Sequence, residues 1–180
     1  MKEKLIAGRY RVTGHLGQGG VGQVLKCLDE VLSNQVAVKI LHTGAGESEL
    51  VRFQKEAQTM AHLEHPNIVK VLDFGLSEGL PFLVMELCEA DSLASWLETG
   101  ELFDFESSYQ IIHQIASALA YAHQQGVLHR DIKPSNVLLT YDSRGNLRTR
   151  ICDFGLAKLK QDQQAQALTS DGAVIGSPAY

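Results

Sequence analysis

Three polar side chains of different chemistry lie close together in the segment from His129 to Asn136. Asp131 supplies a carboxylate, Lys133 an ammonium group and Asn136 an amide. A carboxylate can accept the proton of an attacking hydroxyl, and an ammonium group can neutralise a phosphoryl group during transfer. An amide oxygen can bind Mg²⁺. The segment therefore predicts phosphoryl transfer to a hydroxyl.

A second carboxylate, Asp153, follows Asn136 by 17 residues. Two runs of strand length flank a turn-rich loop at residues 142–146, which predicts a hairpin over residues 137–152. A short hairpin would bring the amide oxygen and the carboxylate together. Both are hard ligands of the kind that Mg²⁺ prefers, with water and phosphate oxygens completing the coordination shell.

Glycines cluster near the start of the chain, in the segment Gly17–Gly22. Glycine lets the backbone approach a polyphosphate and point its N–H groups at it. The dinucleotide-binding form of G-x-G-x-x-G opens a helix, whereas here predicted strands at residues 9–16 and 24–28 stand on both sides. The segment alone leaves a plain glycine-rich hairpin open as the alternative.

Lys39 stands on an otherwise apolar predicted strand, residues 35–41. An ammonium group that points inward requires a partner. Glu56, within a helix predicted over residues 48–62, is the natural candidate. A solvent-exposed strand lysine is the alternative, and the glycine-rich segment upstream argues against it.

The elements change in character near residues 86–91. Two further strands, residues 68–74 and 81–87, precede this point, and two helices, residues 92–98 and 105–125, follow it. The order of elements predicts an α+β fold. The helical spacing of apolar residues predicts an apolar stripe on the longer helix, made of Tyr109, Ile112, Ile115, Ala116, Leu119 and Ala122.

The composition is that of a globular protein. The chain has 180 residues, of which 44% are hydrophobic and 21% charged. Its net charge of -5 argues against a dedicated nucleic-acid binder. No apolar run approaches the roughly 20 residues that span a bilayer, and the first residues carry no apolar signal core, so we expect a cytoplasmic protein. The three widely spaced cysteines indicate neither a zinc site nor disulfides.

Taken in order, these segments resemble the eukaryotic-type (Hanks-type) serine/threonine protein kinases, and in particular their bacterial members. The resemblance is carried by the glycine-rich segment, Val36-Ala37-Val38-Lys39, His129-Arg130-Asp131 with Asn136, Asp153-Phe154-Gly155, and Gly176-Ser177-Pro178-Ala179-Tyr180. It implies a two-lobed fold, with an antiparallel small lobe at about 1–86 and a partial, mainly helical large lobe at about 87–180. The A-P-E segment would follow Tyr180, so we expect a fragment of a longer product, or else a truncated product.

The resemblance also implies roles for individual residues. ATP is expected to contact Leu16, Gly17, Gly19, Gly22, Val24, Ala37, Lys39, Met85, Glu86, Cys88 and Leu138, of which residues 86–88 form the hinge. The implied catalytic residues are Asp131, Lys133, Lys39 and Glu56. The implied ligands of Mg²⁺, or of Mn²⁺, are Asn136 and Asp153. Cys152 is implied to face the nucleotide, and His129 is implied to stack with Phe154.

The implied partner is a protein substrate with a serine or threonine hydroxyl, the acceptor class to which Lys133 points. Arg130 is implied to pair with a phosphate on Thr169 or Ser170, and a dimer would permit autophosphorylation. No nucleic acid and no membrane segment are expected in this portion. Two alternatives stay open: a kinase-like protein that binds nucleotide without catalysis, and a small-molecule kinase of related fold.

Overall fold

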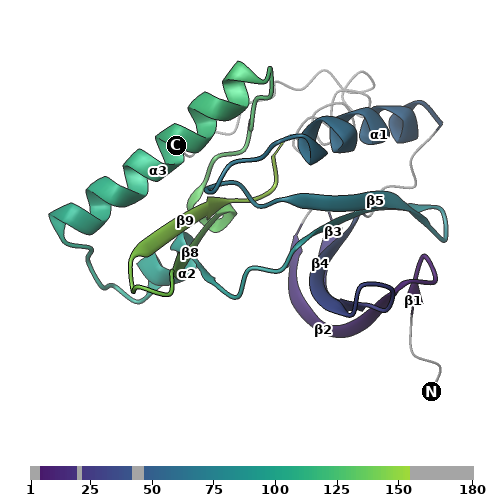
Figure 1. The fold of residues 1–180 in the computed structure, drawn as a ribbon, viewed down its shortest axis with the longest axis horizontal. Helices are drawn as coiled ribbons and strands as arrows, with labels where there is room; N and C mark the ends of the chain where they lie inside the picture. Colours follow the sequence, from purple (N-terminus) through teal and green to yellow (C-terminus); the bar gives the residue numbers. More distant parts are fainter. Residues whose placement is uncertain (1–4, 20–21, 42–46, 155–180) are drawn as a thin grey trace, which may run out of the picture.

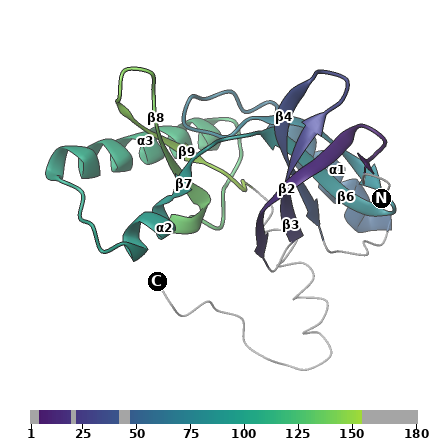
Figure 2. The ribbon, with the colours of Figure 1, turned by 90° about the horizontal axis from the view of Figure 1, so that it is seen from below.

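The computed structural model of the chain describes residues 5–19, 22–41 and 47–154. One part combines a six-stranded sheet with helix α1, and the other combines helices α2 and α3 with a three-stranded sheet (Figure 1). The same two parts are seen from below in Figure 2, with β2, β3 and β4 in one and β7, β8 and β9 in the other. The predicted change from strands to helices is therefore present. The proposed lobe boundary near residue 86 stays a prediction.

The larger sheet is antiparallel throughout and is strongly curled (Figure 1). Its spatial order is β1-β2-β3-β4-β6-β5. The strands are β1 (Leu5–Ile6), β2 (Tyr10–Gly19), β3 (Gly22–Asp29), β4 (Asn34–Leu41), β5 (Val71–Ser77) and β6 (Leu80–Glu86).

Strand β4 is buried on both faces, which explains its continuous apolar run. Val36, Val38 and Ile40 pack into one core cluster within the curled sheet. Ala37 and Leu41, on the opposite face, belong to a second cluster. Helix α1 (Glu47–Ala61), which lies along β5 (Figure 1), contributes Phe53, Ala57 and Met60 to the second cluster.

The second part is built around the long helix α3 (Phe105–Gln124). Asp104 caps its first turn by accepting a bond from the backbone N–H of Ser107 at 2.7 Å. The remaining elements are β7 (Asp91–Ser92), α2 (Leu93–Glu98), the 3₁₀ turn η1 (Pro134–Asn136), β8 (Val137–Tyr141) and β9 (Leu147–Ile151). Strands β8 and β9 form the predicted hairpin. No described helix has the length and apolar character needed to cross a membrane.

The predicted apolar stripe of α3 is only partly covered. Tyr109 and Ile112 are 56% and 67% exposed, and Ala116 is also exposed. The buried residues of α3 are Ile111, Ala118 and Ala122. Periodicity gives the spacing of apolar residues, but β9 packs against a different side of the helix, and this contact decides which residues are covered.

The segment before β5 joins the two parts. We predicted a strand from Ile68, but β5 begins at Val71, and Ile68 instead forms an isolated bridge to Ile151 of β9. The backbone N–H of Val69 donates to the carbonyl of Ile151 at 2.9 Å. The buried amide of Asn67 donates to the carbonyl of Thr149 at 2.7 Å. The hairpin is thereby fixed to the loop that leaves α1.

The glycines of the segment Gly17–Gly22 differ in the space available for a side chain. A Cβ atom on Gly22 would lie 2.0 Å from the backbone oxygen of Ile40 on β4, whereas a Cβ on Gly17 or Gly19 would meet nothing within 4 Å. Gly22 is therefore required by close packing of β3 on β4. Gly17 and Gly19 leave open space beside the backbone.

We predict that Gly22→Ala destabilises the protein and that Gly17→Ala does not. The added methyl group at position 22 forces the two strands apart, at a cost of about 1–3 kcal/mol. Thermal melting of the purified full-length variants measures the difference. An equal melting temperature for Gly22→Ala and the wild type would contradict the packing role.

Candidate active site

A cavity of about 460 Å³ lies between the larger sheet and the second part of the molecule. Leu16, Gly17 and Val24 reach it from β2 and β3, and Ala37 reaches it from β4. The remaining lining residues are Val69, Met85, Glu86, Leu87, Cys88, Ala90, Asp91, Ser92, Ser95, Ser135, Asn136, Leu138, Cys152 and Asp153. Residues distant in sequence thus line one cleft.

Most residues predicted to contact nucleotide line this cavity. They are Leu16, Gly17, Val24, Ala37, Met85, Glu86, Cys88 and Leu138. Gly19, Gly22 and Lys39 do not line it. The sequence reasoning missed Asp91, Ser92 and Ser95, which follow the hinge directly. No local pattern in the sequence predicts that these polar residues line the cavity.

Lys39 makes a buried ion pair with Asp153. Its Nζ atom lies 2.5 Å from Asp153 Oδ2, and the side chains are 7% and 26% exposed. Lys39 is held in the middle of β4 by pairing with Val24 and Leu83 on the neighbouring strands. A buried ammonium group is tolerated only with a partner, so this contact fixes the segment after β9 to the larger sheet.

Glu56, the partner predicted for Lys39, lies half-buried on α1. The described ion pair of Lys39 is the one with Asp153. The pairing of Lys39 with Glu56 stays a prediction.

The three side chains that opened the sequence argument converge. Lys133 Nζ lies 2.7 Å from Asp131 Oδ2. Asn136 Nδ2 donates to the backbone oxygen of Asp131 at 2.8 Å and lies 3.4 Å from Asp131 Oδ2. The 3₁₀ turn η1 brings Asn136 back toward Asp131, because Pro134 starts the turn and the N–H of Asn136 donates to the carbonyl of Lys133.

His129 connects this loop to the segment that carries Asp153. Its Nε2 donates to the carbonyl of Cys152 at 2.9 Å, and its Nδ1 accepts the backbone N–H of Asp131 at 3.3 Å. These two bonds require a neutral ring, and burial lowers the pKa of His129 accordingly. The ring also packs edge-on against Phe154, with centroids 4.5 Å apart. The predicted stacking of His129 with Phe154 is therefore present.

The site suits a hard divalent cation shared with a phosphate. Asn136 and Asp153 line the same wall of the cavity, and the bonds described for the Asn136 side chain use Nδ2, which leaves the amide oxygen for a cation. Among the described residues, no group of three or more His, Cys, Asp or Glu side chains forms a protein-only metal site. Mg²⁺ fits such a site, because it is held by one or two protein oxygens together with phosphate oxygens.

Arg130 is exposed and adopts a positive φ of 66°, and Asp153 has a φ of 65°. Non-glycine residues in this region carry backbone strain and are concentrated at functional sites. The predicted phosphate acceptors Thr169 and Ser170 lie outside the described residues, as does the segment Gly176–Tyr180. The pairing of Arg130 with a phosphate stays a prediction.

The cavity thus adjoins a loop that carries a carboxylate, an ammonium group and an amide. The family model for the protein kinase domain matches residues 10–180. The chain therefore belongs to the protein kinase family.

Curated relatives are bacterial serine/threonine-protein kinases. The chain is 37% identical to pkn2 of Myxococcus xanthus over 98% of its length, and 36% identical to PrkC of Bacillus subtilis over the same share. It spans 21% and 26% of those two proteins, so it matches only about a quarter of their lengths.

Solved structures show the same fold. The kinase domain of Mycobacterium tuberculosis PknI superposes with a TM-score of 0.75 at 28% identity, covering 99% of this chain and 82% of that one. Rad53 (residues 1–466), solved in complex with AMP-PNP, gives a TM-score of 0.73 at 26% identity, covering 83% and 39%. The predicted two-lobed kinase-like fold is confirmed.

We predict that Cys152 is alkylated slowly at neutral pH and that ATP protects it. Burial, followed by the charge of Asp153, raises the pKa of the thiol to about 12. The reactive thiolate therefore becomes more abundant as pH rises toward that value. Mass-spectrometric mapping after iodoacetamide treatment between pH 7 and 10 measures the rate.

Cys27 is the matched control, because it is buried in the other core cluster and does not line the cavity. ATP should leave its labelling unchanged. Equal labelling of Cys152 with and without ATP would contradict its placement beside the nucleotide.

Proposed function

We propose that the protein is an ATP- and Mg²⁺-dependent serine/threonine protein kinase. The observation that carries this proposal is the meeting of Asp131, Lys133, Asn136 and Asp153 at one end of a cavity whose other walls suit a nucleotide. The names of the bacterial relatives support the same activity and the same class of acceptor.

The cavity suits an adenine ring held between two apolar surfaces. Ala37 on β4 and Leu138 on β8 line it from different sheets, and Val24 adds a third apolar contact. The backbone of residues 86–88 offers hydrogen-bonding groups along one edge. Gly17 leaves the backbone of β2 open to approach by phosphates.

Each charged group then has a task in transferring the γ-phosphoryl group. Asp131 orients the substrate hydroxyl and accepts its proton as the oxygen attacks phosphorus and the bond to the β-phosphate oxygen breaks. Lys133, already 2.7 Å from Asp131, neutralises charge on the transferred group. Mg²⁺, when bound, supplies further charge neutralisation at the phosphates.

Lys39 and Asp153 are expected to exchange partners when nucleotide binds. The carboxylate of Asp153 is engaged by Lys39 in the structure, and a cation bound to that carboxylate would compete with the ammonium group. Phosphate oxygens of the nucleotide offer Lys39 a replacement partner.

We predict that Asp131→Asn abolishes most phosphoryl transfer while nucleotide still binds. Asparagine keeps the size of the side chain but cannot accept the proton, so the turnover number should fall about 10²–10⁴-fold. The measurement is transfer of radiolabelled phosphate from ATP to a generic protein substrate by the full-length protein, with phosphoamino-acid analysis. Glu98→Gln, an exposed change on α2, is the control that should retain activity.

Nucleotide binding by the wild type without any phosphoryl transfer would contradict the proposed kinase activity. It would favour a protein that binds nucleotide without catalysis. Phosphotyrosine as the sole product would overturn the serine/threonine assignment. Transfer to a small metabolite alone would favour the small-molecule kinase.

We predict that Asp153→Asn removes most of the Mg²⁺ dependence of ATP binding. The neutral amide loses the charge that attracts the cation and leaves Lys39 without its carboxylate. Calorimetric titration of ATP with and without Mg²⁺ compares the variant with the wild type. A variant in which Mg²⁺ strengthens ATP binding as much as in the wild type would exclude Asp153 as a metal ligand.

A further inference from the structure

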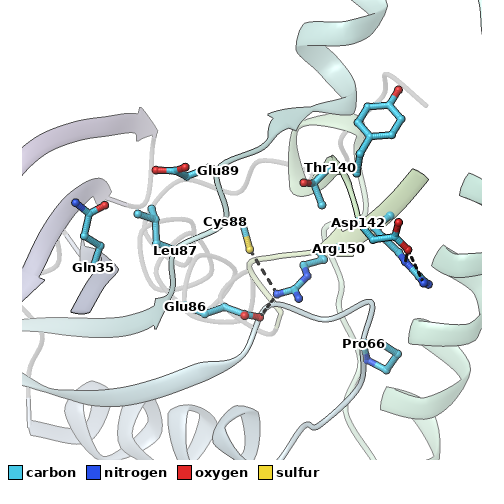
Figure 3. A pocket seen from close by; sticks show the side chains of 11 residues that line it. Gln35, Pro66, Glu86, Leu87, Cys88, Glu89, Thr140, Asp142 and Arg150 are labelled. Atoms are coloured by element: carbon cyan, nitrogen blue, oxygen red, sulfur yellow. Dashed lines mark hydrogen bonds and ion pairs between the residues drawn. The ribbon is translucent and has the colours of Figure 1, made fainter. Parts of the chain in front are cut away.

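The hinge is held from behind by an arginine of the hairpin. Arg150 on β9 places Nη1 2.5 Å from Glu86 Oε1 and 3.7 Å from the sulfur of Cys88. Figure 3 shows the guanidinium group beside both side chains. This contact is on the side of a second cavity, of about 670 Å³, which is lined by Gln35, Pro66, Glu86, Leu87, Cys88, Glu89, Thr140, Tyr141, Asp142, Arg148 and Arg150.

Glu86 also contacts the backbone of Lys70. The backbone N–H of Lys70 donates to Glu86 Oε1 at 2.9 Å, and the N–H of Glu86 donates to the carbonyl of Lys70 at 3.0 Å. Strand β6 also pairs with β4 at this point, where Glu86 stands opposite Val36. Glu86 Oε1 is therefore shared between Lys70 and Arg150, and the second of these contacts joins the hinge to β9.

Arg150 belongs to the strand ladder that forms the floor of the nucleotide cavity. It stands directly opposite Leu138 in the β8–β9 pairing, so the two side chains lie on the same face of the hairpin. Leu138 lines the nucleotide cavity, and Arg150 reaches the hinge. One face of one hairpin thus contacts both the space for the adenine ring and the wall beside it.

The hinge is a thin wall between two cavities. Glu86, Leu87 and Cys88 line both the nucleotide cavity and the rear cavity. Protein packing therefore supports the rear of this segment only in part. The contacts of Arg150 with Glu86 and Cys88 connect the hinge to β9 on the side of the rear cavity.

We propose that Arg150 is a positioning residue for the nucleotide. Through its contacts with Glu86 and Cys88, Arg150 sets the distance between the hinge and the β8–β9 hairpin. This inference rests on the proposed function. Without the guanidinium group, the hinge loses its contact with β9. The residues around the adenine ring are then less well ordered in the protein without ATP, and ordering them costs binding free energy. The effect should therefore fall on nucleotide binding rather than on the transfer step.

The test compares Arg150→Ala with Arg148→Ala in the full-length protein. Arg148 is the matched control, because it lies on the same face of β9 and pairs with Asp142 of its own hairpin at 3.0 Å, without a described contact to Glu86 or Cys88. For Arg150→Ala we expect the dissociation constant of Mg·ATP and the KM for ATP to rise about three- to tenfold, the size of effect expected from one partly exposed ion pair. The turnover number should change less than KM, and Arg148→Ala should resemble the wild type.

A double-mutant cycle locates the effect. If the ion pair is responsible, Glu86→Gln should weaken ATP binding as Arg150→Ala does, and the two changes together should cost little more than either alone. Arg150→Lys, which keeps the charge, should restore part of the affinity.

Unchanged ATP binding in Arg150→Ala would overturn the inference, and so would an equal loss in Arg148→Ala, which would indicate general damage to the hairpin. A fall in the turnover number without a change in KM would also overturn it. Failure of the wild type to bind Mg·ATP would instead contradict the proposed function, and the two failures are thereby distinguished.

Discussion

The buried ammonium group of Lys39 is the constraint on which the arrangement of the site depends. Strand β4 is covered on both faces, so its one charged side chain has no route to water and must find a carboxylate. Asp153, 114 residues away in sequence, provides it. Because Asp153 directly follows the hairpin of the other part, satisfying one buried charge also sets where the hairpin stands relative to the larger sheet.

Hydrogen bonds between uncharged groups then connect the segment after β9 to the loop at residues 129–136. The ring of His129 joins the carbonyl of Cys152 to the N–H of Asp131, so the position of the segment after β9 determines that of the loop. A second link runs from Asn136, whose carbonyl accepts the N–H of Cys152 at 3.0 Å. These hydrogen bonds therefore place the backbone of both segments, while the carboxylates of Asp131 and Asp153 contact Lys133 and Lys39.

The sequence predicted what depends on local pattern and motif order. The hairpin, the long helix α3 and the set of residues around the cavity followed from turn residues, apolar spacing and resemblance. It failed where a distant neighbour decides, because the start of β5 depends on the bridge from Ile68 to Ile151. The contact of Lys39 with Asp153 had no local signal, because strand pattern says only that a partner is needed.

The contacts of Arg150 could not be predicted either, because its partners are distant in sequence. Arg150 stands three residues before Asp153, in a segment whose pattern predicts only the end of a strand. Both residues nevertheless make ion pairs with the larger sheet: Asp153 with Lys39, and Arg150 with Glu86 at the hinge. Because both pairs start from the same short segment, a rotation of β9 relative to the larger sheet would strain both together. The segment that ends the hairpin is therefore joined to the larger sheet at two points, through Lys39 and through Glu86.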